Sequence, residues 1–105
     1  AMWKEKADTS PAFMWIASSD NSRSTQITSG RAYARMNLAA TGHGLSIHPW
    51  SMALQEYPEM ADLYTEQQSM LGGSADAPVQ MLVRIGYAPQ IAPAPRRGLA
   101  AHLKV

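Results

Sequence analysis

The sequence of 105 residues contains no cysteine, which excludes disulfide bonds, thiolate metal sites and cysteine nucleophiles. Charged residues are also sparse, at 16% of the chain, and the formal net charge is only +1. So small a net charge gives no electrostatic reason to expect nucleic acid or an anionic membrane as a partner. Because the absence of cysteine fits a reducing compartment, we expect a cytoplasmic protein.

Long apolar runs are missing as well. The longest, Ala12–Ala17, is far shorter than the roughly 20 residues that a membrane-spanning helix needs. The N-terminus has no apolar core of the kind found in secretory signals. We therefore expect no membrane partner.

General catalytic and metal-binding motifs are not found either. Gly42-His43-Gly44 lacks the third glycine of a dinucleotide fingerprint. His43 and His48 flank a predicted glycine turn, and we interpret them as surface or capping histidines rather than as a metal pair. Accordingly, no catalytic residue and no metal site is predicted.

The most informative stretch that is present runs from Ser24 to His43, and we predict that it forms one long helix. It contains no proline, and at 1.5 Å per residue it would span roughly 30 Å, the width of a small domain. Two neighbouring faces of this helix are apolar: Ile27, Ala34, Leu38 and Thr41 on one, and Tyr33, Met36 and Ala40 on the other. So wide an apolar surface predicts a central helix that a second copy of the chain partly covers, and hence a homodimer.

The rest of the chain predicts an α+β fold in a single domain, residues 1–105. A loose lead-in, residues 1–11, precedes an apolar strand at 12–17 that we expect to be covered on both faces. After the long helix we predict a strand at 45–48, a helix starting at Ser51 and interrupted before Pro58, a strand at 79–87 and an extended tail, 88–105.

Two groups of arginines need an explanation. Arg84 lies within the apolar strand 79–87, and a buried guanidinium requires a partner. We favour an ion pair with Glu56, Glu59 or Asp62 over a ligand contact. Arg96 and Arg97 have the forked geometry that binds phosphate, although composition alone favours a solvated pair.

Several motifs occur together in a recognisable order. They are Gly30-x-Ala32-x-x-Arg35-x-x-Leu38-x-Ala40-Thr-x-x-Gly44-Leu45, then Pro49, Glu56-x-Pro58, Gln80-x-Leu82-x-Arg84-x-Gly86-Tyr87 and Pro95-Arg96-Arg97-x-Leu99. With these motifs the chain resembles the C-terminal half of the nitroreductase family, especially a branch whose members end in a Pro-Arg-Arg tail. The resemblance covers most of the chain, from about Phe13 to Leu103.

The resemblance implies an α+β fold that dimerises extensively and binds FMN between the subunits. In such enzymes an NAD(P)H-type donor reduces the flavin, which then reduces nitro compounds or quinones. The turn Trp50-Ser51-Met52, following Pro49, would present its backbone to the flavin ring. Arg96 and Arg97 would help to hold the flavin phosphate.

Two departures from the family qualify this expectation. Many members have Glu-Gly where this chain has Ser51-Met52, and nothing before Phe13 resembles the family's N-terminal half, which supplies much of the phosphate and ribityl contact. We therefore expect the chain alone to bind FMN loosely or not at all and to be inactive by itself. Either it is a fragment of an FMN-dependent oxidoreductase, or it is a shortened dimeric relative that has lost FMN and acts as an interaction module.

Overall fold

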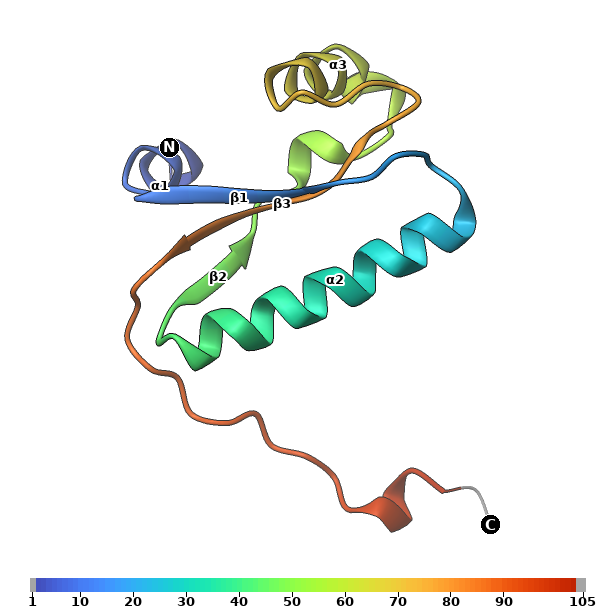
Figure 1. The fold of residues 1–105 in the computed structure, drawn as a ribbon. Coiled ribbons are helices and arrows are strands. Elements are labelled where there is room, and N and C mark those ends of the chain that lie inside the picture. Colours follow the sequence, from blue (N-terminus) through green and yellow to red (C-terminus); the bar gives the residue numbers. More distant parts are fainter. Residues whose placement is uncertain (1, 104–105) are drawn as a thin grey trace.

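The computed structural model describes residues 2–103 and contains a small antiparallel sheet with helices on both sides (Figure 1). The chain runs through α1 (Met2–Asp8), β1 (Ala12–Ala17), α2 (Arg23–Gly42), β2 (Ser46–Pro49), α3 (Ala61–Met70) and β3 (Val79–Gly86). Short 3₁₀ helices η1 (Met52–Leu54), η2 (Pro58–Met60) and η3 (Leu99–Ala101) complete it. The predicted α+β class is confirmed.

The last strand in the sequence is the middle strand of the sheet. The order is β1-β3-β2, and β3 pairs antiparallel with both neighbours. Because directly paired residues share a face, the register divides the side chains into two sets. One face carries Met14, Ile16, Ile47, Met81, Val83 and Ile85, and the other carries Phe13, Trp15, His48, Leu82 and Arg84.

The long helix α2 packs along the first of these faces. It touches all three strands, and Tyr33 lines a small hollow together with Met81. The side chains that turn towards the sheet lie at helical spacing: Thr25, Ser29, Tyr33, Met36 and Ala40. In Figure 1, α1, η1 and α3 lie on the opposite side of the sheet from α2. The three strands are therefore sandwiched between two unequal helical layers.

Local chemistry sets both ends of α2, close to the predicted bounds of 24 and 43. Ser22 is the N-cap residue, and its hydroxyl accepts a hydrogen bond from the Thr25 N–H at 3.3 Å. At the other end, Gly44 has a φ of +72°, the left-handed conformation that favours glycine. The helix was therefore predictable from its glycines and its capping residues.

Two predictions about the N-terminal part are wrong. The lead-in is not loose, because Met2–Asp8 forms helix α1, whose Lys4 and Asp8 make an i,i+4 ion pair at 3.3 Å. Strand β1 is not covered on both faces either. It lies at the edge of the sheet, and five of its six side chains are exposed. An unbroken apolar run indicated a central strand, whereas β3 takes that position.

The break before Pro58 is as predicted, but the helix predicted to start at Ser51 is only the three-residue 3₁₀ helix η1. Pro58 begins η2 after an extended Tyr57, and α3 starts only at Ala61. Ser51 precedes η1, although its side chain makes no capping hydrogen bond. Beyond β3, residues 88–98 form neither helix nor strand and are exposed, and the tail leads away from the sheet (Figure 1).

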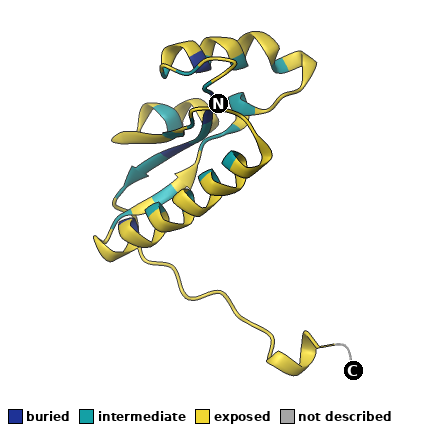
Figure 2. Ribbon diagram, turned by 45° about the vertical axis from the view of Figure 1, so that its right-hand side comes forward, coloured by how far each residue is buried: buried dark blue, intermediate teal, exposed yellow. Residues whose placement is uncertain are grey.

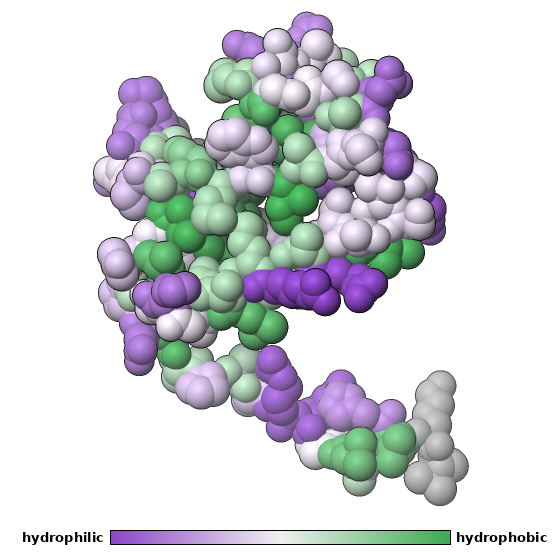
Figure 3. Space-filling view, in the orientation of Figure 1, coloured by the Kyte–Doolittle hydropathy of each residue, from purple (hydrophilic) through white to green (hydrophobic). Residues whose placement is uncertain are grey.

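The buried core is small for a chain of this length. Its apolar members among the described residues are Ala40 of α2, Pro78 directly before β3, and Val79, Leu82 and Val83 of β3. Figure 2 shows these buried positions as short dark segments, while most of α2 remains exposed. Figure 3 shows hydrophobic residues gathered on the surface around the sheet and the C-terminal segment standing apart from the body. Much apolar surface is thus left in contact with solvent.

Among residues 2–103, Gln68 is the one buried polar side chain, at 4% exposure. Its amide pairs with the backbone of Val79: Nε2 donates to the Val79 carbonyl at 3.1 Å, and Oε1 accepts from the Val79 N–H at 2.7 Å. The Gln68 amide therefore makes the two backbone hydrogen bonds that a residue on a neighbouring strand would otherwise make. These bonds connect α3 to the first residue of β3.

Candidate functional site

A group of polar and aromatic side chains lies on the sheet face opposite α2. His48 and Arg84 are direct partners in the β2–β3 register, so their side chains lie side by side. Arg84 Nε donates to His48 Nδ1 at 3.0 Å, and Arg84 Nη1 donates to the Lys6 carbonyl of α1 at 3.3 Å. The guanidinium also lies 5.4 Å from the ring centroid of Trp50, a cation–π distance.

Helix α1 closes over this group. The rings of Trp3 and Trp50 meet edge to face with centroids 5.4 Å apart, and Lys6 Nζ lies 5.0 Å from the Trp3 centroid. Arg84 is thus held by two strands, the turn after β2 and the N-terminal helix. We call Lys6, His48, Trp50 and Arg84 the arginine cluster.

The predicted ion pair of Arg84 with Glu56, Glu59 or Asp62 is wrong. Its partners are an imidazole and a backbone carbonyl, and within residues 2–103 the Lys4–Asp8 contact is the sole ion pair. The β2–β3 register places His48 directly beside Arg84, and α1 brings the Lys6 carbonyl to the same guanidinium, so the partners come from elements that the sequence pattern did not connect with Arg84.

The cluster also affects His48. Desolvation lowers the pKa of His48 below its ordinary value of 6.5, and the positive charges of Arg84 and Lys6 lower it further. His48 is therefore neutral at pH 7. Because its Nδ1 accepts a hydrogen bond from Arg84, the ring proton lies on Nε2. His43 is the C-cap residue of α2, which agrees with the predicted capping role.

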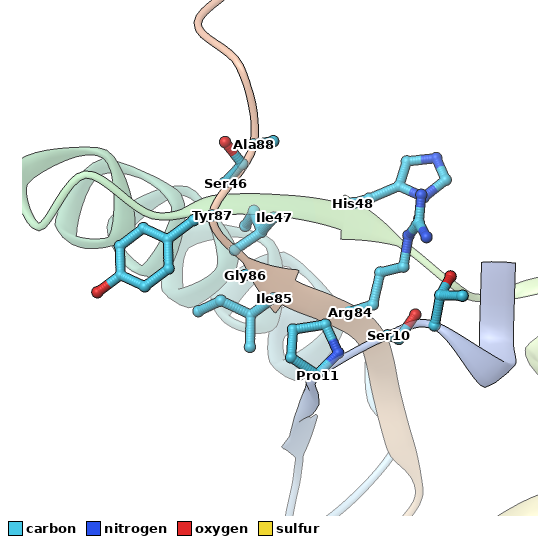
Figure 4. A pocket seen from close by; sticks show the side chains of 11 residues that line it. Ser10, Pro11, Ser46, Ile47, His48, Arg84, Ile85, Gly86, Tyr87 and Ala88 are labelled. Carbon is cyan, nitrogen blue, oxygen red and sulfur yellow. The ribbon is translucent and has the colours of Figure 1, made fainter.

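A pocket of about 270 Å³ adjoins the arginine cluster (Figure 4). Gly86 at the end of β3 lines it, and a Cβ atom there would lie 2.8 Å from the Pro11 ring, so a larger residue would require Pro11 to move. Ser46 and Ile47 of β2 form one wall, and the link between α1 and β1 forms another. Figure 4 shows the His48 and Arg84 side chains meeting at one end of the pocket.

The predicted flavin-ring turn, Pro49 to Met52, starts at the same place. Pro49 ends β2, and the Trp50 N–H donates to the Leu82 carbonyl at 2.8 Å. This N–H is therefore occupied within the chain. The Ser51 N–H has no hydrogen-bond acceptor within residues 2–103. Met52 follows with its side chain 44% exposed.

The predicted phosphate residues lie elsewhere. Arg96 and Arg97 are exposed, and Arg96 Nη1 donates only to nearby tail carbonyls, those of Ala94 at 3.5 Å and Pro95 at 3.3 Å. The tail leads these arginines away from the turn at 49–52 (Figure 1). One chain therefore does not bring the two halves of the predicted flavin site together.

Sequence reasoning missed most of the arginine cluster. The contribution of Trp3 and Lys6 depends on α1, which was predicted as loose chain. The pairing of His48 with Arg84 depends on the β2–β3 register, and those strands are separated by α3 and its flanking loops. A period-two pattern identifies each strand but not the register between distant ones.

Comparisons with protein-family models, with curated proteins and with solved structures returned no match. In the part of the chain that the structure describes, no group of histidine, aspartate or glutamate side chains is arranged to hold a metal ion. None of the helices in residues 2–103 has the length and apolar character needed to cross a bilayer.

Proposed function

We propose that this chain is a nitroreductase-like flavoprotein segment that supplies part of an FMN site between two copies of itself. The proposal starts from the resemblance in motif order and from one structural observation, the uncovered face of α2. Ile27 and Leu38, on the side of α2 away from the sheet, are 63% and 74% exposed. A cytoplasmic location belongs to the same proposal.

The accessible surface supports a partner for this face. The chain exposes 8277 Å², whereas a compact monomer of 11.4 kDa would expose about 5,800 Å². The difference of about 2,500 Å² is comparable with what each subunit buries in a large obligate dimer, about 1,000–2,500 Å². Part of this excess belongs to the tail, and part to α2 and β1.

The chain offers different numbers of hydrogen-bond donors to the two ends of FMN, the flavin ring and the phosphate. At the ring, the Ser51 N–H is a free donor beside an exposed Met52 side chain, while the Trp50 N–H is already used. At the phosphate, Arg96 and Arg97 offer two guanidinium forks on a tail that is long enough to lie on a second copy. When bound, FMN would supply the redox chemistry between an NAD(P)H-type donor and a nitro or quinone acceptor.

The free energies of the available contacts predict that FMN binds weakly to this chain alone. A hydrogen bond to a charged group contributes about 1.5–3 kcal/mol. Two such contacts are largely offset by an association cost of at least about 4 kcal/mol. We therefore expect FMN affinity weaker than micromolar, with the phosphate as the main determinant.

The test compares FMN with riboflavin, which lacks the phosphate. Each flavin is titrated with the wild-type chain and with the Arg96→Ala/Arg97→Ala double variant, and flavin fluorescence is followed. The wild type should prefer FMN by about tenfold or more, and the double variant should bind both flavins equally weakly. A variant with Lys4→Ala on exposed α1 and Arg23→Ala at the first residue of α2 removes the same charge outside the tail and the turn at 49–52, and it serves as the control.

Two results would contradict the proposal. A preference for FMN that survives in the double variant would refute the phosphate assignment. If neither flavin binds to the wild-type chain and the chain is a stable dimer, the result would favour the alternative. In that alternative the chain is a shortened relative that has lost the flavin and acts as an interaction module.

A further inference from the structure

In the arginine cluster, the positive charge of Arg84 has no carboxylate partner among the described residues. Arg84 is half-buried, and no aspartate or glutamate is among the residues that line its pocket. The acidic residues of α1 do not pair with it: Asp8 binds Lys4, and the Glu5 side chain makes no hydrogen bond or ion pair within residues 2–103. Lys6 adds a second positive charge close to the first.

Arg84 also retains unused donors. A guanidinium has five N–H groups, and Arg84 uses one at Nε, for His48, and one at Nη1, for the Lys6 carbonyl. The remaining three have no acceptor within residues 2–103. A partly buried guanidinium with free donors and no carboxylate is incompletely neutralised, which favours binding of an anion.

The neighbouring groups are donors as well. His48 carries its proton on Nε2, because Nδ1 already accepts from Arg84. Ser46 also lines the pocket, and its hydroxyl takes part in no hydrogen bond with the described residues. A pocket of about 270 Å³ is at the small end of ligand sites, so it suits a compact ligand.

We propose that the pocket between β2, the end of β3 and the α1–β1 link binds a phosphate group through Arg84, with His48 and Ser46 as further donors. The site is separate from the phosphate role of Arg96 and Arg97 in the proposed flavin site. It requires only one chain, because α1, β2 and β3 of the same copy build it.

Inorganic phosphate is the probe for this site. The intact chain is titrated with sodium phosphate at fixed pH and ionic strength, and the ring proton resonances of the three histidines are followed by NMR. His48 should shift and saturate, whereas His43 and His102, which lie outside the pocket, should not. They also report any drift in pH. A His48 response that is not saturable, or that all three histidines share, would overturn the proposal.

Variants identify the residue responsible. Arg84→Met should weaken phosphate binding by about tenfold or more, and Arg84→Lys should restore it in part, because lysine keeps the charge but loses the fork. Arg31→Met, on exposed α2, removes the same charge and should change nothing. Equal weakening by Arg31→Met and Arg84→Met would show general charge attraction and refute the site. The wild-type histidine comparison decides the matter even if Arg84→Met does not fold.

The two proposals fail independently. The Arg96→Ala/Arg97→Ala variant should keep the saturable His48 response although it loses its preference for FMN. Loss of the His48 response in that variant would mean that the tail arginines bind the phosphate, and it would refute a separate site.

Discussion

At the scale of single residues, two neighbouring glutamines show how much one buried amide can determine. Gln68 satisfies both backbone groups of Val79, whereas the Oε1 atom of Gln67 is buried with no hydrogen-bond partner in the described residues. The side chains have the same size and chemistry. Their contributions to stability should nevertheless have opposite signs, because burial favours a polar group only when it is paired.

The first prediction tests this contrast. Gln68→Met removes both partners of Val79 and should lower the free energy of unfolding by about 1–3 kcal/mol for each backbone group left unpaired. Gln67→Met removes an unpaired acceptor and should leave stability unchanged or raise it. Urea denaturation of both variants measures the difference. Equal losses would show that packing at this helix matters more than the amide pairing.

The second prediction concerns His48. In Arg84→Met, one of the two neighbouring positive charges is gone, so the pKa of His48 should rise from its wild-type value. It should still lie below 6.5, because desolvation is the larger cause. NMR titration of the His48 ring protons gives both values, and Lys6→Met should produce a smaller rise. An unchanged pKa in Arg84→Met would contradict the observed geometry.

The same group makes stability depend on pH with a definite sign. The folded pKa of His48 lies below that of the unfolded chain, so the unfolded state binds more protons as the pH falls below about 6.5. Stability from this residue is therefore present above that pH and decreases below it, until His48 is protonated in the folded state as well. The dependence should be weaker in Arg84→Met.

At the scale of elements, α2 is the clearest case of a helix specified by its ends. Ser22 supplies the N-cap oxygen, and the Asp20 carboxylate accepts from the Ser22 N–H at 2.8 Å and so fixes the turn before it. Hydrogen bonds from Thr25, and then from Ser22, hold the pKa of Asp20 below its ordinary value. The first turn has no acidic residue, so the cap is its main local stabilisation.

The third prediction follows from the cap. Ser22→Ala should destabilise the chain by about 0.5–2 kcal/mol, because an N-terminal N–H of α2 loses its acceptor. Thr28→Ala, at an exposed position inside the same helix, is the matched control and should be neutral or slightly stabilising. Thermal unfolding followed by circular dichroism measures both. A Ser22→Ala variant as stable as the control would mean that Asp20 alone holds the helix start.

What sequence could predict at this scale depended on local signals. Glycines, prolines and capping residues act within a few positions, so α2, the break at Pro58 and strand β3 were predictable. Helix α1 was missed because its seven residues are mostly polar and show no apolar stripe. The exposure of β1 was missed because an apolar run has the same sequence in the middle of a sheet and at its edge. Strand order is a property of long-range pairing.

In the candidate site, too, local features could be predicted from sequence and long-range contacts could not. Pro49 to Met52 lies at the end of a strand, as expected, because Pro49 ends β2 locally. The prediction that Arg84 pairs with a carboxylate was wrong. The actual partners of Arg84 come from β2 and α1, which are distant from it in sequence. The roles of Arg96 and Arg97 remain predictions, since they depend on a second copy.

At the scale of the whole molecule, the chain is open rather than compact. Its radius of gyration is 16.6 Å, compared with about 13 Å for a compact domain of 100 residues. The projecting tail and a long helix packed on only one side account for this shape (Figure 1). Such a shape is consistent with the proposed dimer, in which a second copy would cover the exposed face of α2.

The fourth prediction tests assembly at α2. Leu38 is 74% exposed in the single chain, so Leu38→Glu should change the stability of a monomer by no more than about 0.5 kcal/mol. In a dimer that buries this face, the same change should cause dissociation, which sedimentation at micromolar concentration would detect. Ala39→Glu, about 100° around the helix, is the control. A wild-type monomer at these concentrations would refute the dimer.

The exposed tail has a consequence for how long the protein survives intact. Residues 88–98 lie outside any helix or strand, and extended, solvent-exposed segments of this kind are the places where proteases cut first. Arg96 and Arg97 are the residues after which trypsin-like proteases cleave. A chain whose tail rests on a partner would keep its C-terminus, whereas an unassembled chain would be trimmed, so proteolysis itself would distinguish assembled copies from solitary ones.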